Sequence, residues 1–414
     1  MDTDDLREQV VSLMGEVRRN GESALREQAQ RFDGVVPERF AVDATYLAAS
    51  LAGLDKNLRR AMEESIRRVT AASEDAIPQA SLTEFHSGGQ VITRFVPVDR
   101  AGVYVPGGKA VYPSSVIMNV VAAQTAGVQE IALVSPAQKD FDGNIHPTIA
   151  AAAKLLGVSE VYALGGAGAI GALAYGVPEI GLAPVDVITG PGNRYVAAAK
   201  NVVRGVVGID SEAGPTEIGI IADDTAHPEF VAADLISQAE HDEWASAVLV
   251  TTSMELAHRV IDAVERQAAT TAHAERVKKA LTGEQSAILV VDNLEHALAI
   301  SDAFAPEHLE VMVEEPAAVV DAIRHAGAIF VGDHTPVSAG DYLAGSNHVL
   351  PTGGASHHSS GLSPLTFLRS QQVVTYDKAA LQAVADHIVT FAEAENLPAH
   401  GDAVTWRFRQ ALEG

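Results

Sequence analysis

Hydrophobic and polar positions divide the chain into a helical start and two alternating series. Up to about residue 90, apolar positions recur at three- and four-residue spacing, as in NLRRAMEESIRRVTAAS, which predicts helices. From residue 101, short apolar runs such as EIALVSP and VDVITG alternate with amphipathic stretches such as PTIAAAAKLLGV. A second series of the same kind runs from IGIIAD to AIFVGD. Such alternation favours βα units on parallel sheets.

The two series predict an α/β fold with two Rossmann-like, doubly wound domains and helical extensions at both ends. We assign residues 1–103 and 218–362 to the first α/β domain and residues 104–217 to the second. The stretch 352–363, rich in Gly, Ser and His, is typical of a loop. Residues 363–414 predict helices too few to form a core, so we expect this tail to pack on another surface, such as a second subunit.

Composition indicates a globular protein. The 414 residues suggest roughly two to three domains, and 47% hydrophobic residues supply each with a core. No apolar run reaches the roughly 18 residues that a membrane span needs. The acidic start MDTDDLREQV differs from a secretory signal, which is basic and then apolar. We therefore expect a cytoplasmic protein with no membrane partner.

Cysteine content and charge exclude several classes of function. The chain has no cysteine, which excludes disulfides, thiolate zinc sites, iron–sulfur clusters and thiol nucleophiles. Any metal ion must therefore be held by nitrogen and oxygen atoms. The formal net charge of −25 repels a polyphosphate backbone, so we expect no nucleic-acid partner, and solubility alone explains the charge.

Several polar side chains stand where chemistry is feasible. Glu307 and His308 are neighbours in APEHLE, between a helical stretch and an apolar run, although a solvated helix end is the commoner interpretation of a lone Glu-His pair. Gln238 and His241 are three apart in a helical pattern, so both side chains can project from one face, which makes a two-point metal ligand set geometrically easy, although such pairs are common by chance. Asp341 lies in a turn-rich stretch after the last strand, where α/β proteins carry sites, or it forms an Asx turn.

Glycine-rich turns offer three candidate dinucleotide loops. GVYVPGG (102–108) and ITGPGN (188–193) each end an apolar run and lead into a helix, so backbone amides can face an anion there. A strict G-x-G-x-x-G match begins at Gly166, and Asp186 follows at the usual distance for the acidic residue. Asp186 begins a strand, however, where it cannot reach a ribose, so close helix–strand packing explains these glycines equally well.

A set of sequence blocks resembles histidinol dehydrogenase, the zinc- and NAD-dependent family of histidine biosynthesis. In chain order the blocks are RAGVYVPGG, VDVITGPGN, DSEAGPTEI, DLISQAEHD, APEHLE, GDYLAGSNHVLPT and ENLPAHGDAV. The resemblance implies oxidation of an amino alcohol, L-histidinol, through L-histidinal to L-histidine, a four-electron reaction that uses two NAD molecules. It also implies a homodimer whose active site is shared across the subunits.

The resemblance gives roles to individual residues. It implies a catalytic pair, Glu307 and His308, in the domain formed by 1–103 and 218–362. The implied zinc ligands, also in that domain apart from the last, are Gln238, His241, Asp341 and, from the partner chain, His400. The implied substrate contacts are Thr216, Gln238, His241, His308, Asp341, His348 and Glu395. The implied NAD contacts, in the domain 104–217, are Tyr104, Gly168 and Asn193, and residues 363–414 become a dimerisation tail.

The resemblance also divides the chemistry between the catalytic pair. His308, with an ordinary pKa of ~6.5, suits removal of the alcohol proton, and Glu307 suits activation of water if a partly apolar site raises its pKa. Neighbouring side chains in a regular strand point to opposite faces, so we expect the pair at an irregular helix-to-strand junction after Pro306. Zinc would act mainly as a template for the substrate's imidazole and amine.

Some features depart from the family pattern. Gly168 replaces a glutamine that contacts NAD in the family's GGAQA, and the lost hydrogen bond costs roughly 0.5–1.5 kcal/mol of cofactor affinity. Lys109 stands where relatives carry a small polar residue, and a cation there would partly compensate. The chain also starts later than most members, without a short segment that contributes to the family's dimer.

These departures leave alternatives open. One is a paralogous zinc and NAD dehydrogenase for another polar alcohol, such as a sulfonated diol, although GDYLAGSNHVLPT and Glu395 favour histidinol. Another class is a zinc hydrolase, in which metal and Glu-His pair activate water on an ester or amide; the Gly-rich turns favour a nucleotide instead. A third is a catalytically silent paralogue, against which the intact site positions argue.

Overall fold

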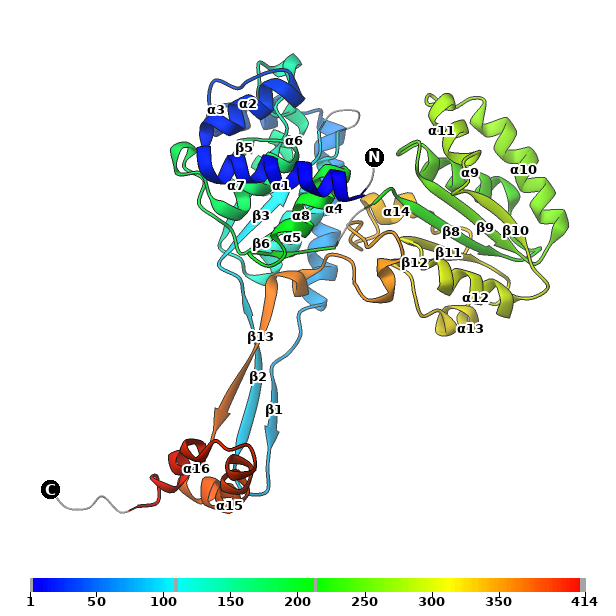
Figure 1. Cartoon of the computed structure of the whole chain (residues 1–414). Helices are drawn as coiled ribbons and strands as arrows, with labels where there is room; N and C mark the ends of the chain where they lie inside the picture. The colour runs from blue at the N-terminus through cyan, green and yellow to red at the C-terminus, as the bar shows by residue number, and fades with distance from the viewer. Residues whose placement is uncertain (1–2, 108–110, 212–213, 410–414) are drawn as a thin grey trace. The chain divides into compact units, whose positions relative to one another are not determined.

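The chain forms two compact units. The large unit comprises Met1–Ala76 and Val98–Phe367, and the small unit comprises Ile77–Pro97 and Leu368–Gly414. The structure, a computed structural model, describes residues 3–107, 111–211 and 214–409. Two parallel sheets lie in the large unit (Figure 1). No helix within the described ranges has the length and apolar content to cross a membrane.

The first sheet has five parallel strands in the order β5-β4-β3-β6-β7. Its strands are β3 (Arg100–Tyr104), β4 (Glu130–Ser135), β5 (Glu160–Ala163), β6 (Val187–Thr189) and β7 (Gly208–Ile209). The helices between them are α5 (Pro113–Ala126), α6 (Pro147–Leu155), α7 (Gly166–Tyr175) and α8 (Arg194–Val203), with short turns η2 (Lys139–Phe141) and η3 (Pro178–Ile180). The strand order reverses between β3 and β6, which is the topological switch point where doubly wound sheets bind ligands.

The second sheet repeats this arrangement, in the order β10-β9-β8-β11-β12. Its strands are β8 (Glu217–Ala222), β9 (Ser246–Thr251), β10 (Ala287–Val290), β11 (His308–Met312) and β12 (Ala328–Val331). Separate apolar cores cover its two faces. Helices α9 (Pro228–Ala239), α10 (Met254–Ala268) and α11 (Ala274–Leu281) contribute to one side, and α12 (Leu294–Phe304) and α13 (Pro316–Ala322) to the other. The shared order confirms two doubly wound domains.

The N-terminal helices pack differently from the sequence assignment of 1–103. They are α1 (Thr3–Asn20), α2 (Glu22–Gln28), the π-helix η1 (Ala29–Asp33), α3 (Ala44–Ala52) and α4 (Lys56–Asp75). Helix α1 packs on α7 and α8 of the first sheet, in one core with them. The reason is the small-residue surface of α7: Gly171 lies against Met14, and Gly168 lies against Gln28. The boundary at 103/104 also cuts through β3, the central strand of the first sheet.

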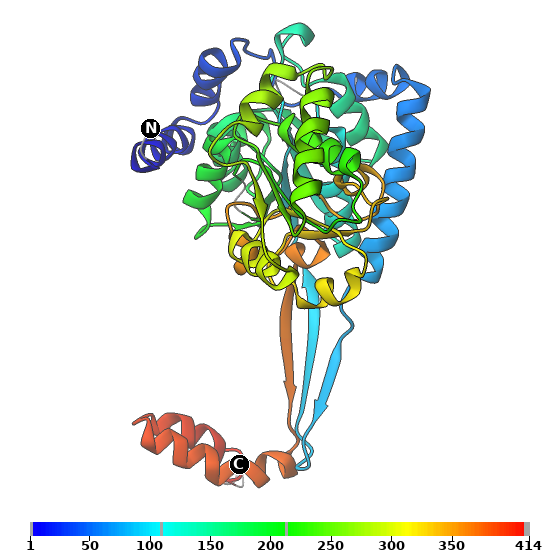
Figure 2. The same cartoon turned by 90° about the vertical axis from the view of Figure 1, so that its right-hand side faces the viewer.

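The small unit corrects the expectation of helices alone at both chain ends. It contains an antiparallel sheet, β1-β2-β13, made of β1 (Ser81–Glu84), β2 (Gln90–Pro97) and β13 (Leu368–Thr375). Helices α15 (Lys378–Ala394) and α16 (Pro398–Thr405) pack on each other. They lie at one end of the three-stranded ribbon, where Tyr376 and Ala380 approach the β1–β2 turn at Gly88 and Gly89 (Figure 2). β-branched residues in QVITRFVP favour the strand.

Candidate functional site

Most of the predicted site residues converge at the amino ends of β8 and β11. Glu217 begins β8, His308 begins β11, and Gln238 lies in the last turn of α9. Asp341 and His348 follow β12. Asp341 lies in the helix α14 (Val337–Tyr342), and His348 lies in the loop after it, before the turns η4 (Ala355–His357) and η5 (Pro364–Phe367). The cluster therefore lies at the amino ends of these strands, whereas doubly wound sheets usually bind ligands at the carboxyl ends.

The Glu307–His308 pair occupies a sharp junction. Helix α12 ends at Phe304, Ala305 takes a left-handed conformation with φ 49°, and β11 begins at His308. Proline at position 306 adds no backbone N–H donor and disfavours a helical conformation at Ala305. The predicted irregular junction is confirmed. Glu307 and His308 are only 8% and 4% exposed, which excludes the solvated helix end.

Glu307 accepts hydrogen bonds on one oxygen only. Thr216 Oγ1 donates to Glu307 Oε2 at 2.5 Å, and the Glu217 backbone N–H donates to the same atom at 3.0 Å. Thr216 Oγ1 in turn accepts a hydrogen bond from Gln238 Nε2. Burial raises the pKa of Glu307 to about 7, against the lowering effect of its hydrogen bonds. The carboxyl group therefore takes up and releases a proton near neutral pH.

His308 is held in the tautomer that a base requires. Its Nδ1 lies 3.0 Å from the backbone oxygen of Glu217. A carbonyl oxygen only accepts, so Nδ1 carries the hydrogen and Nε2 keeps a lone pair. Burial lowers the pKa of His308, which keeps the ring neutral.

Gln238 and His241 do not share a helix face as predicted. Helix α9 ends at Ala239, so Gln238 is 1% exposed inside it, whereas His241 lies in the following turn and is exposed. A hydrogen bond of 3.3 Å from the His241 backbone N–H to the backbone oxygen of Gln238 keeps the two residues adjacent. Because Gln238 Nε2 is used by Thr216, its Oε1 is the atom available to a metal ion.

Asp341 and His348 form a second pair. Asp341 lies within α14, not in the expected turn. His348 Nδ1 donates to the backbone oxygen of Asp341 at 2.9 Å, and its Nε2 lies 3.3 Å from Ser115 Oγ. Burial lowers the pKa of His348 to about 4, so this ring is neutral and accepts from the serine. Burial raises the pKa of Asp341, while the charges of His308 and His241 lower it, which places these groups within electrostatic range.

Ser115 is a site residue that the sequence analysis missed. It lies in the first turn of α5, the helix that follows the GVYVPGG stretch in the chain, and is 2% exposed. Its hydrogen bond to His348 joins the carboxyl end of the first sheet to the amino end of the second. The signal was a Pro-Ser-Ser helix start behind a glycine-rich turn, which marks side chains gathered at a helix N-terminus.

Two buried carboxyl groups support the cluster from behind. Glu310, two residues after His308, accepts a hydrogen bond of 3.1 Å from the Val337 N–H at the start of α14. Asp234 on α9 shares a side-chain hydrogen bond with Glu310. Burial raises both pKa values, that of Asp234 to about 6, so the pair holds a proton that bridges the carboxyl groups. The pair thereby links α9, β11 and α14, which carry the candidate site.

The buried Asp234–Glu310 pair should make the free energy of unfolding depend on pH. The folded protein keeps Asp234 protonated up to about pH 6, whereas the unfolded chain releases that proton near the ordinary pKa of 3.8. The folded state then binds more protons in this window, so the free energy of unfolding falls as pH rises, by about 2 kcal/mol between pH 4.5 and 7. The Asp234→Asn variant should lose this dependence. Urea unfolding of both proteins at the two pH values measures it; parallel pH dependences would contradict the assignment.

The residues predicted to contact NAD lie at the carboxyl ends of the strands of the first sheet, whereas the cluster described above lies at the amino ends of β8 and β11. Tyr104 ends β3 and is buried, and its hydroxyl accepts a hydrogen bond of 3.4 Å from the Gly166 N–H. Asn193 is exposed and caps α8, because its Oδ1 accepts from the N–H groups of Tyr195 and Val196 at 3.0 and 3.2 Å. Strands β3 and β6 meet at the switch point, so Tyr104 and Asn193 flank the expected ligand position.

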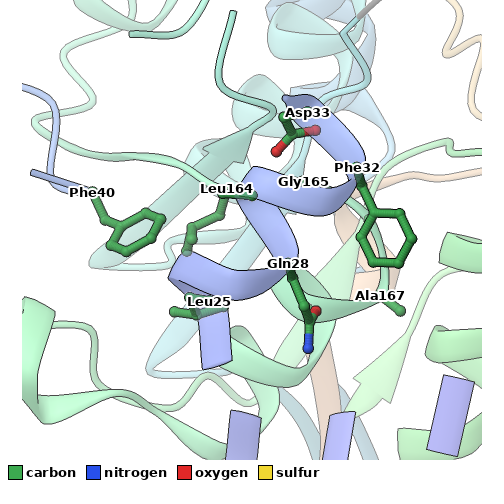
Figure 3. Close-up of a pocket in the computed structure, with 11 residues that line it drawn as sticks. Leu25, Gln28, Phe32, Asp33, Phe40, Leu164, Gly165 and Ala167 are labelled. Atoms are coloured by element: carbon green, nitrogen blue, oxygen red, sulfur yellow. The ribbon is translucent and has the colours of Figure 1, made fainter. Parts of the chain in front are cut away.

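Gly168 occupies the first turn of α7, where Gln28 lies over it. A Cβ atom at position 168 would stand 2.3 Å from Gln28 Oε1, and Gln28 Nε2 is bound to the Leu13 oxygen at 2.9 Å. A pocket lies beside this turn, lined by Leu25, Gln28, Ala29, Phe32, Asp33, Phe40 and Leu164–Gly168 (Figure 3). Burial raises the pKa of Asp33 there to about 6. The glycine at position 168 thus serves helix–helix packing. Lys109, which was expected to compensate for it, lies outside the described residues.

Two predicted residues belong to the small unit. Glu395 caps the end of α15, His400 lies in α16, and both are exposed. Within the described residues, no three His, Cys, Asp or Glu side chains converge as a metal cluster. Of the implied ligands in the large unit, only His241 and Asp341 are of those types, since the third is the amide of Gln238.

Comparisons with known proteins show which family the chain is similar to. The family model for histidinol dehydrogenase matches residues 1–408. Curated relatives named histidinol dehydrogenase, from Leifsonia xyli subsp. xyli and Thermobifida fusca, are 59% and 57% identical over 400 residues. These alignments each cover 97% of this chain, and 92% and 91% of the relatives. The chain belongs to the histidinol dehydrogenase family.

A solved structure agrees with the family membership. The crystal structure of histidinol dehydrogenase from Elizabethkingia anophelis matches with a TM-score of 0.94 and 34% identity, over 99% of this chain and 93% of that one. The chain is thus an oxidoreductase of the histidinol dehydrogenase family that acts on a small-molecule substrate. The family resemblance noted in the sequence is confirmed.

Proposed function

We propose that the chain oxidises L-histidinol through L-histidinal to L-histidine, with zinc and two successive NAD molecules. The observation that carries this proposal is the buried Glu307–His308 pair, which combines a neutral imidazole with a carboxyl group whose pKa is raised to about 7. An alcohol oxidation followed by hydration and oxidation of an aldehyde needs two proton removals at one place, and this pair supplies two bases there.

From the hydrogen bonds we propose an atom for each proton. His308 Nε2 takes the alcohol proton, because Nδ1 is engaged with Glu217. Glu307 Oε2 is occupied by Thr216 and the Glu217 N–H, so Oε1 takes the proton from the water that attacks the aldehyde. The same two donors hold the Glu307 carboxylate in place after it ionises.

For zinc we propose Gln238, His241 and Asp341 of one subunit and His400 of the partner subunit. The free Oε1 of Gln238, an exposed imidazole and a carboxylate fit the N/O ligand set that a cysteine-free chain must use. Bound zinc supplies a template that orients the imidazole and amine of the substrate. Thr216 and His348 then line the substrate position, and Glu395 of the partner subunit suits the ammonium group by charge.

For NAD we propose the switch point of the first sheet, between Tyr104 and Asn193. A Cβ atom at Gly190 would lie 1.9 Å from the Tyr104 oxygen, so the turn after β6 approaches β3 more closely than a side chain permits. Asn193 follows this turn and caps α8 with its Oδ1, so its Nδ2 group remains as a donor for NAD. Bound NAD supplies the hydride acceptor, and Gly168 leaves one side-chain contact out of the usual set.

The small unit supports a homodimer. Val374, Phe391 and Trp406 are 62%, 70% and 63% exposed in the single chain, and Glu395 and His400 of the same unit are exposed too. Large apolar side chains gathered in one small unit mark an interaction surface. A second copy that binds there would form the dimer in which we propose that each subunit supplies Glu395 and His400 to the other. We retain a cytoplasmic location as a prediction.

One assay tests the proposal. Purified protein with zinc, NAD and L-histidinol is followed by the absorbance of NADH and by the yield of histidine. We expect two NADH per histidinol consumed, one for each oxidation. A protein that turns over another polar alcohol but not histidinol would contradict the substrate, and NADH-independent hydrolysis of an ester or amide would contradict the reaction class.

Removal of the metal should abolish the activity. After dialysis against a chelator we expect the rate of histidinol oxidation to fall by about 10²-fold or more, because the template for the substrate is lost. Zinc, but not magnesium, should restore the rate, since Mg²⁺ favours oxygen ligands. The melting temperature should rise on zinc addition, because an ion that binds the folded state stabilises it. Unchanged activity in the chelated, zinc-free protein would contradict the site.

A further inference from the structure

A buried ion pair lies beneath the turn that follows β6. Lys200, in α8, and Asp210, directly after β7, form an ion pair with side chains only 1% and 2% exposed. Lys200 is among the largest fully buried side chains in the described part of the chain. Neither residue belongs to the sites described above.

The pair binds both backbone polar groups of one residue, Gly190. Lys200 Nζ donates to the Gly190 oxygen at 3.0 Å, and the Gly190 N–H donates to Asp210 Oδ2 at 2.7 Å. Gly190 has a φ of 115°, a conformation that L side chains rarely adopt. The Gly190 backbone is thus fixed from α8 and from β7 at once.

The fixed Gly190 borders both proposed NAD contacts. Gly190 lies against the Tyr104 backbone oxygen, as the 1.9 Å approach of a hypothetical Cβ shows. Asn193, which caps α8, follows three residues later in the same turn. Movement of Gly190 would therefore displace Tyr104 and Asn193 relative to each other.

Stability alone is a weak explanation of this pair. Two charges that leave water pay a desolvation penalty, and apolar replacements of similar volume often serve stability as well or better. What an apolar pair cannot do is hold a glycine by its N–H and its C=O. The specific effect of Lys200 and Asp210 is therefore to fix the shape of the 190–193 turn.

We propose that Lys200 and Asp210 are positioning residues that hold the 190–193 turn in the shape that binds NAD. The inference rests on the proposed NAD site. It predicts that loss of the pair weakens cofactor binding while the chemistry at Glu307 and His308 continues at its usual rate once the cofactor is bound.

The Lys200→Met/Asp210→Asn double variant tests the proposal. It removes both charges together, so no buried charge is left unpaired. The new asparagine keeps an acceptor for the Gly190 N–H, while the Gly190 oxygen loses its donor. We expect the KM for NAD and the Kd for NADH, measured by fluorescence, to rise about tenfold, which corresponds to one lost charge-assisted hydrogen bond. The kcat and the KM for histidinol should stay within about twofold.

The matched control is an ion pair at the other end of the same sheet. Arg100, at the start of β3, pairs with Glu160 at the start of β5. The Glu160→Gln variant breaks that pair far along the strands from the 190–193 turn. We expect it to lower the melting temperature without changing the KM for NAD.

Each outcome decides the proposal. A folded double variant with unchanged NADH binding, or an equal loss of NADH binding in Glu160→Gln, would overturn it. If the double variant does not fold, Lys200→Met alone, whose Asp210 partner becomes neutral by taking up a proton, should raise the Kd for NADH, because the Gly190 oxygen loses its donor, and no change would count against the pair. NADH binding needs no substrate, so these results stand apart from whether the wild-type protein oxidises histidinol.

Discussion

The His308→Asn variant should oxidise histidinol about 10²- to 10⁴-fold more slowly than the wild-type protein, because the base that takes the alcohol proton is gone. Asparagine preserves much of the local geometry, since its side-chain N–H group can still donate to the Glu217 oxygen that now accepts from His308 Nδ1. What it lacks is a basic lone pair at the position of Nε2. The expected loss is therefore one of kcat, with a small change in KM.

Supplying L-histidinal directly separates the two half-reactions. If His308 serves only the alcohol step, the variant should still oxidise added L-histidinal at a rate within about tenfold of the wild type. Stopped-flow measurement of NADH formation from each substrate distinguishes the steps. Equal losses on alcohol and aldehyde would show that His308 positions both substrates, contrary to its assignment as the alcohol base.

The Glu307→Gln variant should have the converse defect. Glutamine is nearly isosteric, and its oxygen can still accept from Thr216 and the Glu217 N–H, which donate to Glu307 Oε2 at 2.5 and 3.0 Å. It cannot take a proton from water. We expect oxidation of L-histidinal to slow by about 10²- to 10⁴-fold, while a first NADH still forms from histidinol.

The pH dependence gives the Glu307 prediction a second readout. Burial raises the pKa of Glu307 from 4.5 to about 7, so the ionised, basic form grows as pH rises through that value. The rate of aldehyde oxidation should rise over the same window in the wild type. The Glu307→Gln variant should show no such rise. A wild-type profile that is flat between pH 6 and 8, or a glutamine variant that keeps two NADH per histidinol, would remove Glu307 from the water step.

Periodicity identified both sheets because each strand is a short apolar run flanked by an amphipathic helix. The runs EIALVSP and SAVLVTTS became β4 and β9 in two sheets of the same strand order. The junction before β11 was also predictable, since Pro306 and two adjacent functional side chains are incompatible with a regular strand. These features depend on neighbours in the chain, which the sequence displays directly.

The remaining errors concern contacts between distant segments. Strands β2 and β13 pair although more than half the chain separates them, and nothing local in LRSQQVVT distinguishes an exposed strand from a loop. Helix α1 packs on α7 because glycines allow a close approach, which spacing alone did not assign. Ser115 and the Asp234–Glu310 pair escaped notice because burial, not residue type, gives them their role.

The two sheets share a strand order, but the residues proposed for NAD lie at the carboxyl ends of the first sheet and those proposed for zinc and catalysis at the amino ends of the second. The turns after β8 and β10, around Asp224 and Asp292, are exposed and lie at the carboxyl ends of their strands, away from the amino ends where Glu217 and His308 begin. A peptide tag or a reporter domain inserted in either of these turns should leave the rate of histidinol oxidation unchanged. These two turns are therefore the positions that we expect to tolerate insertions for labelling or immobilising the protein.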